Sequence, residues 1–114
     1  PDIMIKCDVE KMQRVFDNLL RNAVNYSFEE EEITIRVTQE ERNVHIVFSN
    51  HGNTIPPDKL ERIFEQFYRL DSARSSGSGG AGLGLAIAKK IVESHGGMIT
   101  ARSENEIIEF EVVI

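Results

Sequence analysis

The 114-residue sequence is poor in cysteine, in basic side chains and in long apolar runs. Its one cysteine, Cys7, excludes an internal disulfide and is typical of a reducing compartment, so a cytoplasmic location is expected. No apolar run approaches the roughly 20 residues that a helix needs to cross a bilayer. With 13 basic against 19 acidic residues the net charge is −6, so the surface as a whole should repel nucleic acid and anionic membrane.

The charge is unevenly distributed along the chain. Residues 66–92 hold four basic side chains and one acid, a local charge of +3, so the other residues carry −9. A small positive island on an acidic protein suits a small anionic ligand better than a polymer. Because the chain begins at Pro1 and ends on the apolar run FEVVI, we expect residues 1–114 to be a single domain excised from a longer protein.

Hydrophobic periodicity predicts both helices and strands. Asp8 is a good N-cap for a first helix, Pro57 can open a short one, and Gly96 and Gly97 end the last. The expected elements are a strand at 3–6, a helix at 9–26, strands at 33–39 and 44–50, a short helix near 58–64, a helix at 83–95, and strands at 98–103 and 107–114. This order indicates an α+β two-layer sandwich, in which about three helices cover one face of a mixed, mostly antiparallel sheet.

The stretch GSGGAGLGLAIAKKIVESHGG, residues 77–97, places a glycine-rich run directly before an amphipathic helix. A helix N-terminus presents unpaired N–H groups and a partial positive charge. Glycines just before it let the backbone approach an anion closely, so Gly80, Gly82 and Gly84 are a candidate phosphate cradle. The alternative is a flexible loop followed by a helix of poor early propensity, and the neighbouring positive island favours phosphate.

A second candidate site lies in NLLRNAVNYS, residues 18–27. Asn18, Asn22 and Tyr26 form a stripe on the predicted helix, and both asparagines lie roughly 100° or more from the centre of its apolar face. A merely solvated face would favour Glu or Lys over asparagine. An amide oxygen is a hard, neutral ligand suited to Mg²⁺, although the stripe alone favours the alternative of two surface asparagines.

Two further segments are ambiguous by themselves. Asn50 and Gly52 in SNHGNTIP follow a strand and could read the flat edge of a ligand, although the same residue types make ordinary turns. In IFEQFYRLDSARS, core packing is the expected role of Phe64 and Phe67. Two arginines of this segment point to phosphate or are simply solvated: Arg69 and Arg74.

Taken in chain order, these segments resemble the N, G1, F and G2 boxes of the sensor histidine kinase catalytic domain. That domain belongs to the GHKL group, which also holds gyrase, mismatch-repair and chaperone ATPases and the anti-sigma serine kinases. The resemblance covers essentially the whole chain, and FYRLDSARSSGSGGAGLGLAIAK is especially similar to vancomycin-resistance-type sensor kinases. It implies the Bergerat ATP-binding fold, ATP and Mg²⁺ as ligands, and an ATP lid over about residues 70–79 anchored by Phe64 and Phe67.

The resemblance also implies a role for each matching residue. Asn22 would bind Mg²⁺, Asn18 would lie close to the phosphates, and both would form the catalytic set together with Arg69 and Arg74. Tyr26 would stack near the adenine. The nucleotide-binding residues that the resemblance implies are Asn18, Asn22, Tyr26, Asn50, Gly52, Ile55, Phe67, Arg69, Arg74, Gly80, Gly82, Leu83 and Gly84.

Several positions depart from the family pattern. Asn50, which would meet the adenine amino group, stands where the family usually has aspartate. Binding should then be weaker, because a neutral hydrogen bond contributes about 0.5–1.5 kcal/mol and a charged one about 1.5–3 kcal/mol. Thr54 replaces a glycine, which puts the loop geometry in doubt, and Asn25 replaces a lysine that many relatives place near phosphate. Relatives that hydrolyse ATP usually carry a glutamate base where this chain has Asn18, so transfer to a protein nucleophile is favoured over hydrolysis.

No histidine of the chain is a convincing phosphoacceptor, because the family's acceptor lies on a helix and is followed by an acid. His45 precedes Ile46, and His51 and His95 each precede glycine. The resemblance therefore implies as partners the dimerisation and phosphotransfer helices of a membrane-anchored parent kinase and, indirectly, a response regulator. The domain itself is expected to be monomeric and cytoplasmic. A nucleotide-responsive interaction module without phosphotransfer, or a domain that no longer binds nucleotide, are the alternatives.

Overall fold

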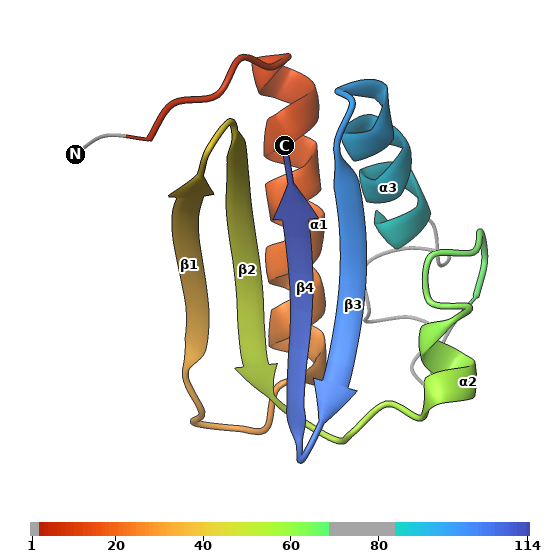
Figure 1. Ribbon diagram of the computed structural model, residues 1–114. Helices are drawn as coiled ribbons and strands as arrows, with labels where there is room; N and C mark the ends of the chain where they lie inside the picture. The colour runs from red at the N-terminus through yellow and green to blue at the C-terminus, as the bar shows by residue number, and fades with distance from the viewer. Residues whose placement is uncertain (1–2, 69–83) are drawn as a thin grey trace.

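An antiparallel sheet with helices over one face organises the chain in the computed structural model, which describes residues 3–68 and 84–114 (Figure 1). The strand order is β1-β2-β4-β3, and every strand pairing in those ranges is antiparallel. In chain order the elements are α1 (Val9–Tyr26), β1 (Ile33–Glu40), β2 (Asn43–His51), α2 (Pro57–Leu60), α3 (Gly84–Ser94), β3 (Met98–Glu104) and β4 (Ile107–Val113). The arrangement confirms the expected α+β sandwich, with α1 and α3 on the sheet and the short α2 beside β3.

Helix α1 begins where the sequence predicts, because Asp8 caps it. The Asp8 side chain accepts a hydrogen bond from the Lys11 backbone N–H at 3.1 Å. Apolar residues at spacings of three and four form the buried face of the helix: Met12, Val15, Leu19 and Ala23. Fully burying a Leu, Val or Met side chain contributes roughly 1.5–3 kcal/mol, so this face fixes the rotation of α1 on the sheet.

The two central strands supply most of the sheet's share of the core. In β2, Ile46 and Phe48 belong to the alternation that faces the helices, and both are buried. The register places Phe48 opposite Phe110 of β4 and Asn50 opposite Ile108. Asn50 continues the same alternation, so a polar side chain lies at a position where the pattern predicts an apolar core residue.

Helix α3 ends at its two glycines, as predicted. Gly96 has φ +76°, a left-handed conformation that glycine adopts without steric cost. The Gly97 backbone N–H donates to the Val92 carbonyl at 3.0 Å and closes the last turn. His95 connects this end to the start of α1, since its Nε2 accepts a hydrogen bond from the Asp8 backbone N–H at 3.0 Å.

Two predictions about the edges of the fold are wrong. Residues 3–6 form no strand and pair with none of the described strands. Alternation indicates which side chains face the protein, but a strand also needs a hydrogen-bonding neighbour, which is a long-range property. Helix α2 begins at Pro57 as predicted but ends at Leu60 rather than near Phe64, and turns follow it.

The inner side of β1 is only partly covered, and Figure 1 shows this strand at the edge of the sheet, beyond α1. Its side chains Ile35 and Val37 are 48% and 45% exposed. With Ile3, Phe16 and Leu20 they line an apolar groove of about 370 Å³. Helix α1 contributes part of this apolar surface through Phe16 and Leu20. Among the helices of the described ranges, none is long and apolar enough to cross a bilayer.

Candidate functional site

The asparagine-bearing flank of α1 lies against the first turn of α3. Asn18 Nδ2 donates a hydrogen bond to the backbone carbonyl of Gly84 at 3.2 Å. A Cβ atom added to Gly84 would lie 3.4 Å from Asn18 Oδ1, so this helix start and the carboxamide are in close contact. The fold thus brings together two segments that the sequence singles out separately, the stripe of asparagines and the glycine-preceded helix.

Two further carboxamides each have a buried nitrogen that finds no partner in the described chain. The Nδ2 atoms of Asn22 and Asn50 form no hydrogen bond with any residue of 3–68 or 84–114. Asn22 lies one helical turn after Asn18, and Asn50 is 1% exposed at the end of β2. Leaving a buried amide donor unsatisfied costs roughly 1–3 kcal/mol, so both atoms are expected to meet a polar partner from outside these ranges.

The end of β2 passes so close to the end of α1 that only glycine fits at residue 52. A Cβ atom on Gly52 would lie 2.0 Å from the Tyr26 carbonyl oxygen and 3.2 Å from Asn50 Nδ2. The following turn continues this contact, because the Phe28 N–H donates to the His51 carbonyl at 2.7 Å. Asn50 is therefore held beside the last turn of the helix that carries the other two asparagines.

Side-chain hydrogen bonds tie the loop after β2 to the second hairpin. Thr54, the residue that replaces the family's glycine, accepts a hydrogen bond through Oγ1 from the Glu106 backbone N–H at 2.7 Å. The Ile55 N–H donates to Ser103 Oγ at 2.8 Å. The Ile55 side chain is 4% exposed in the core, against which Tyr26 also packs. Ile55 and Tyr26, which are both predicted to bind the nucleotide, thus contribute to the core packing.

The two phenylalanines after α2 have different environments. Phe64 packs edge-to-face on Phe110, with ring centroids 6.0 Å apart, and Lys89 Nζ lies 5.8 Å from its ring centre. Phe67 is 66% exposed and has φ +66°, which is uncommon for a bulky residue. The expected core role is confirmed for Phe64 and wrong for Phe67, because the segment after α2 is made of turns and carries no helical periodicity.

The remaining predictions fall on residues that the structure does not describe. The predicted lid over residues 70–79 lies wholly outside the described ranges. Five of the predicted nucleotide-binding residues also lie outside them: Arg69, Arg74, Gly80, Gly82 and Leu83. The part of the candidate site that is described therefore comes from α1, the end of β2 and the start of α3.

The donor set of this region suits a metal ion only in part. Residues 3–68 and 84–114 contain no group of three or more His, Cys, Asp and Glu side chains that could hold a metal. Mg²⁺ usually takes one or two protein ligands and completes its shell with water and substrate phosphates. The single neutral oxygen of Asn22 therefore fits a metal ion that arrives with a polyphosphate, and does not fit one held by protein alone.

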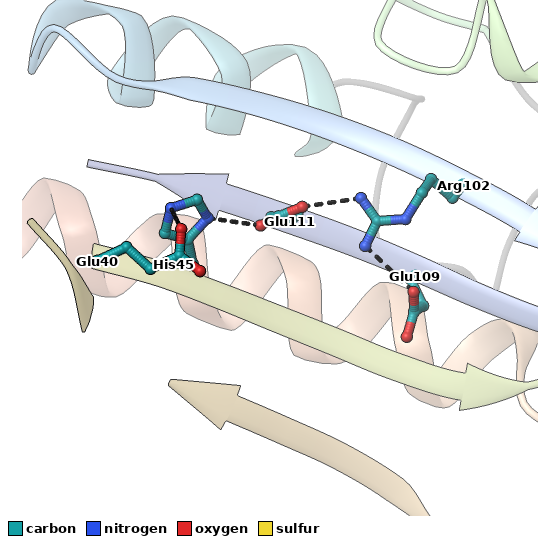
Figure 2. Close-up of polar contacts among 5 residues, drawn as sticks. All are labelled: Glu40, His45, Arg102, Glu109 and Glu111. Atoms are coloured by element: carbon teal, nitrogen blue, oxygen red, sulfur yellow. Dashed lines mark hydrogen bonds and ion pairs between the residues drawn. The ribbon is translucent and has the colours of Figure 1, made fainter. Parts of the chain in front are cut away.

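A polar cluster on the opposite face of the sheet is absent from the sequence predictions. Figure 2 shows Glu111 between His45 and Arg102, with contacts of 2.8 Å to His45 Nδ1 and 2.8 Å to Arg102 Nη1. Arg102 Nη2 also donates to Glu109 at 3.1 Å. The His45 hydrogen bond and then Arg102 lower the pKa of Glu111. The alternation of apolar and polar residues along each strand could place these side chains on the solvent-exposed face of the sheet. Which of them become neighbours depends on the register between the strands.

Comparison with protein families now defines the class of this protein. Residues 7–112 match the family of histidine kinase-, DNA gyrase B- and HSP90-like ATPases, and the chain belongs to that family. The match runs from the N-cap region of α1 to the penultimate residue of β4, so it includes all the other described elements in full and most of β4. It confirms the resemblance carried by the four motif segments.

Sensor kinases are among the most similar proteins. The chain is 50% identical to sensor protein VanS of Enterococcus faecium and 44% identical to VanSC of Enterococcus gallinarum, and both alignments cover 97% of this chain. It is 43% identical to the sensor histidine kinase WalK of Bacillus subtilis, and this alignment covers 90% of this chain. The chain spans 30%, 29% and 17% of VanSC, VanS and WalK.

Solved structures agree with this fold. The catalytic domain of histidine kinase ThkA superposes with a TM-score of 0.82 at 29% identity, over 96% of this chain and 69% of that one. The mycobacterial sensor histidine kinase MprB gives 0.80 at 27% identity, over 94% and 71%. Full-length ShkA in complex with AMPPNP gives 0.77 at 27% identity, over 90% and 21%. The fold is that of a histidine kinase catalytic domain.

Proposed function

We propose that this chain binds Mg²⁺-ATP and donates the γ-phosphate to a histidine on a separate helical segment of a longer sensor kinase. The observation that carries the proposal is the hydrogen bond from Asn18 to Gly84, which sets the start of α3 against the carboxamide flank of α1. Family membership supports a nucleotide as the ligand at this junction. The AMPPNP complex of the related kinase ShkA supports the same ligand class.

The start of α3 is suited to bind phosphate. The helix has 11 residues and no acidic side chain in its first turn, so no side chain there neutralises its positive end. Asn18 would hold this helix start in place through its bond to the Gly84 carbonyl. The residues predicted to complete the phosphate contacts are Arg69, Arg74, Gly80, Gly82 and Leu83.

Asn22 would hold Mg²⁺ through its side-chain oxygen, with phosphates and water as the other ligands. When bound, the ion would neutralise part of the phosphate charge. The buried Asn22 Nδ2, which has no partner in the described ranges, is then available to donate to a phosphate oxygen. One carboxamide would thus serve the metal through its oxygen and the phosphates through its nitrogen.

The adenine base of ATP would lie at the end of β2, where the Asn50 side chain would contact the edge of the purine ring. Asn50 is the one buried polar residue of the described chain, and its Nδ2 has no partner there. Gly52 lets α1 approach this strand end, so that Tyr26 and Asn50 flank the same region. The predicted lid, anchored by Phe64 and Phe67, would cover the nucleotide.

Transfer to a protein nucleophile is favoured over hydrolysis because the α1 flank has no general base. Asn18 occupies the position of the glutamate in hydrolytic relatives, and an amide does not accept a proton at neutral pH. Asp17, the acid nearest in sequence, lines the apolar groove instead. Water would therefore be activated poorly, whereas a histidine supplied with its own neighbouring acid would not need a base from this chain.

The acceptor histidine is assigned to another segment, because His45 and His51 lie in β2, His95 follows the end of α3, and none of the three is followed by an acid. His45 bonds Glu111 on the outer face of the sheet. Both ring nitrogens of His95 are engaged: Nε2 accepts from the Asp8 N–H, so Nδ1 carries the proton and donates to the Ile91 carbonyl at 2.8 Å. The acceptor is therefore assigned to the dimerisation helices of a membrane-anchored parent, which would pass phosphate on to a response regulator.

A transfer assay tests this function. The 114-residue chain is mixed with a dimeric acceptor-helix fragment of a related sensor kinase, Mg²⁺ and γ-labelled ATP. Acid-labile label on the fragment's histidine is the expected result. Tight ATP binding without label would instead identify a nucleotide-responsive interaction module, and no ATP binding would contradict both.

A further inference from the structure

Asn50 is unusual because it is a buried polar side chain whose donor is unused within the described part of the chain. It lies between Ile33 of β1 and Ile108 of β4 in the register, on the helix-facing side of the sheet. It is 1% exposed, and its Nδ2 finds no acceptor in residues 3–68 and 84–114. A ligand that satisfies this atom must offer a hydrogen-bond acceptor.

A carboxamide and a carboxylate select different ligands at such a position. An ionised carboxylate only accepts hydrogen bonds, whereas a carboxamide both donates and accepts and can turn by 180° to exchange its two ends. The 6-position of adenine carries an amino donor, and the 6-position of guanine or hypoxanthine carries a carbonyl acceptor. A carboxylate would therefore match adenine and repel a 6-oxopurine, whereas the Asn50 amide can pair with either.

We propose that the base site accepts 6-oxopurine nucleoside triphosphates as well as ATP, and that Asn50 determines this breadth. The inference rests on the proposed function, since it places the purine edge at the end of β2. Sites that use a fixed donor or acceptor reject the mismatched base strongly because a buried group is left unpaired. The Asn50 amide can turn its oxygen toward a 6-amino group or its nitrogen toward a 6-carbonyl group, so selectivity between the two bases is expected to be weak.

The test compares Mg²⁺-ATP and Mg²⁺-ITP by isothermal titration calorimetry on the 114-residue chain. ITP is chosen because its base lacks the 2-amino group of guanine, which leaves the 6-position as the main difference. For the wild-type chain, the two dissociation constants are expected to agree within about tenfold. For Asn50→Asp, ATP binding is expected to strengthen and ITP binding to weaken, so that the ratio of the two dissociation constants changes at least about tenfold.

A matched control places the same charge elsewhere on the same strand. Asn43, at the other end of β2, is exposed, and Asn43→Asp should leave the ratio of the two affinities unchanged. The wild-type comparison needs no variant, so it stands even if Asn50→Asp folds poorly.

The outcomes separate this inference from the function on which it rests. ATP binding with rejection of ITP by the wild-type chain would overturn the inference and leave the proposed function intact. ITP binding with an unchanged ratio in a folded Asn50→Asp would overturn the role of Asn50. Failure of both nucleotides to bind would overturn the proposed function itself.

Discussion

Asn18 in α1 and Gly84 at the start of α3 are joined by a 3.2 Å hydrogen bond across 66 positions of sequence. The donor is a side chain and the acceptor is the backbone of the first helical residue, so the bond fixes where α3 begins relative to α1. Asn22 follows one turn later, and its buried Nδ2 has no partner among residues 3–68 and 84–114. The two helices therefore present their polar groups at a common junction.

Asn18→Ala is expected to weaken Mg²⁺-ATP binding about tenfold, because it removes the contact that holds the α3 start. Folding should change little, since the higher helix propensity of alanine offsets part of the lost hydrogen bond. Calorimetric titration and urea unfolding measure the two effects separately. The exposed Gln13→Ala on the same helix is the control, and equal affinity in Asn18→Ala and wild type would contradict the role of Asn18.

Asn22→Ala is expected to remove most of the gain in ATP affinity that Mg²⁺ provides. Its oxygen would be the metal ligand, whereas no described acidic or His/Cys cluster could replace it. ATP titrations with Mg²⁺ and with EDTA give this gain for each variant. Asn43→Ala, an exposed carboxamide, should keep the wild-type gain. A variant at residue 22 that retains the full metal dependence would show that Asn22 is no ligand.

Gly52→Ala is expected to lower the free energy of unfolding by about 1–3 kcal/mol, because the added Cβ would meet the Tyr26 carbonyl oxygen at 2.0 Å and the backbone must shift. Urea unfolding followed by circular dichroism measures this loss. Gly96→Asn is the comparison, since Gly96 has φ +76° but open space around it, and asparagine tolerates that conformation. The account of residue 52 fails if both substitutions cost the same.

Glu111→Gln is expected to reduce stability at neutral pH and to flatten its dependence on acid. The folded pKa of Glu111 is lowered, chiefly by His45 and then by Arg102, from an ordinary value of 4.5. The hydrogen bond with His45 and the ion pair with Arg102 therefore stabilise the fold above that pH, and they lose their effect as pH falls through the lowered pKa of Glu111. The loss at pH 7 should be about 0.2–1 kcal/mol.

Urea unfolding at pH 7 and at several values below 4.5 tests this expectation. Glu104→Gln, an exposed carboxyl at the end of β3, should keep the acid dependence of the wild type. An identical acid dependence in Glu111→Gln and wild type would rule out a contribution from the cluster.

Local signals in the sequence predicted most of the fold. Asp8 caps α1, Pro57 opens α2 and the glycine at residue 96 ends α3, because each acts through the backbone next to it. The apolar alternation predicted both hairpins. What failed depends on distant neighbours: residues 3–6 lack a paired strand, and Phe67 lacks a covering surface.

The candidate site was predictable as residue types but not as contacts. The asparagine stripe and the glycine-preceded helix are visible in the sequence, yet their junction requires the packing of α1 on α3. The use of Thr54 as an acceptor for the Glu106 N–H depends on the position of the second hairpin, which no local pattern specifies. The cluster around Glu111 likewise follows from register.

Nuclear magnetic resonance of the isotopically labelled chain titrated with Mg²⁺-AMPPNP tests the central claim most directly. The claim predicts that the side-chain amides of Asn18, Asn22 and Asn50 and the Gly84 backbone amide shift together with one dissociation constant. The backbone amides of His45 and Arg102 on the outer face should stay in place. Shifts confined to the outer face, or no shifts on addition of Mg²⁺-AMPPNP, would contradict the account.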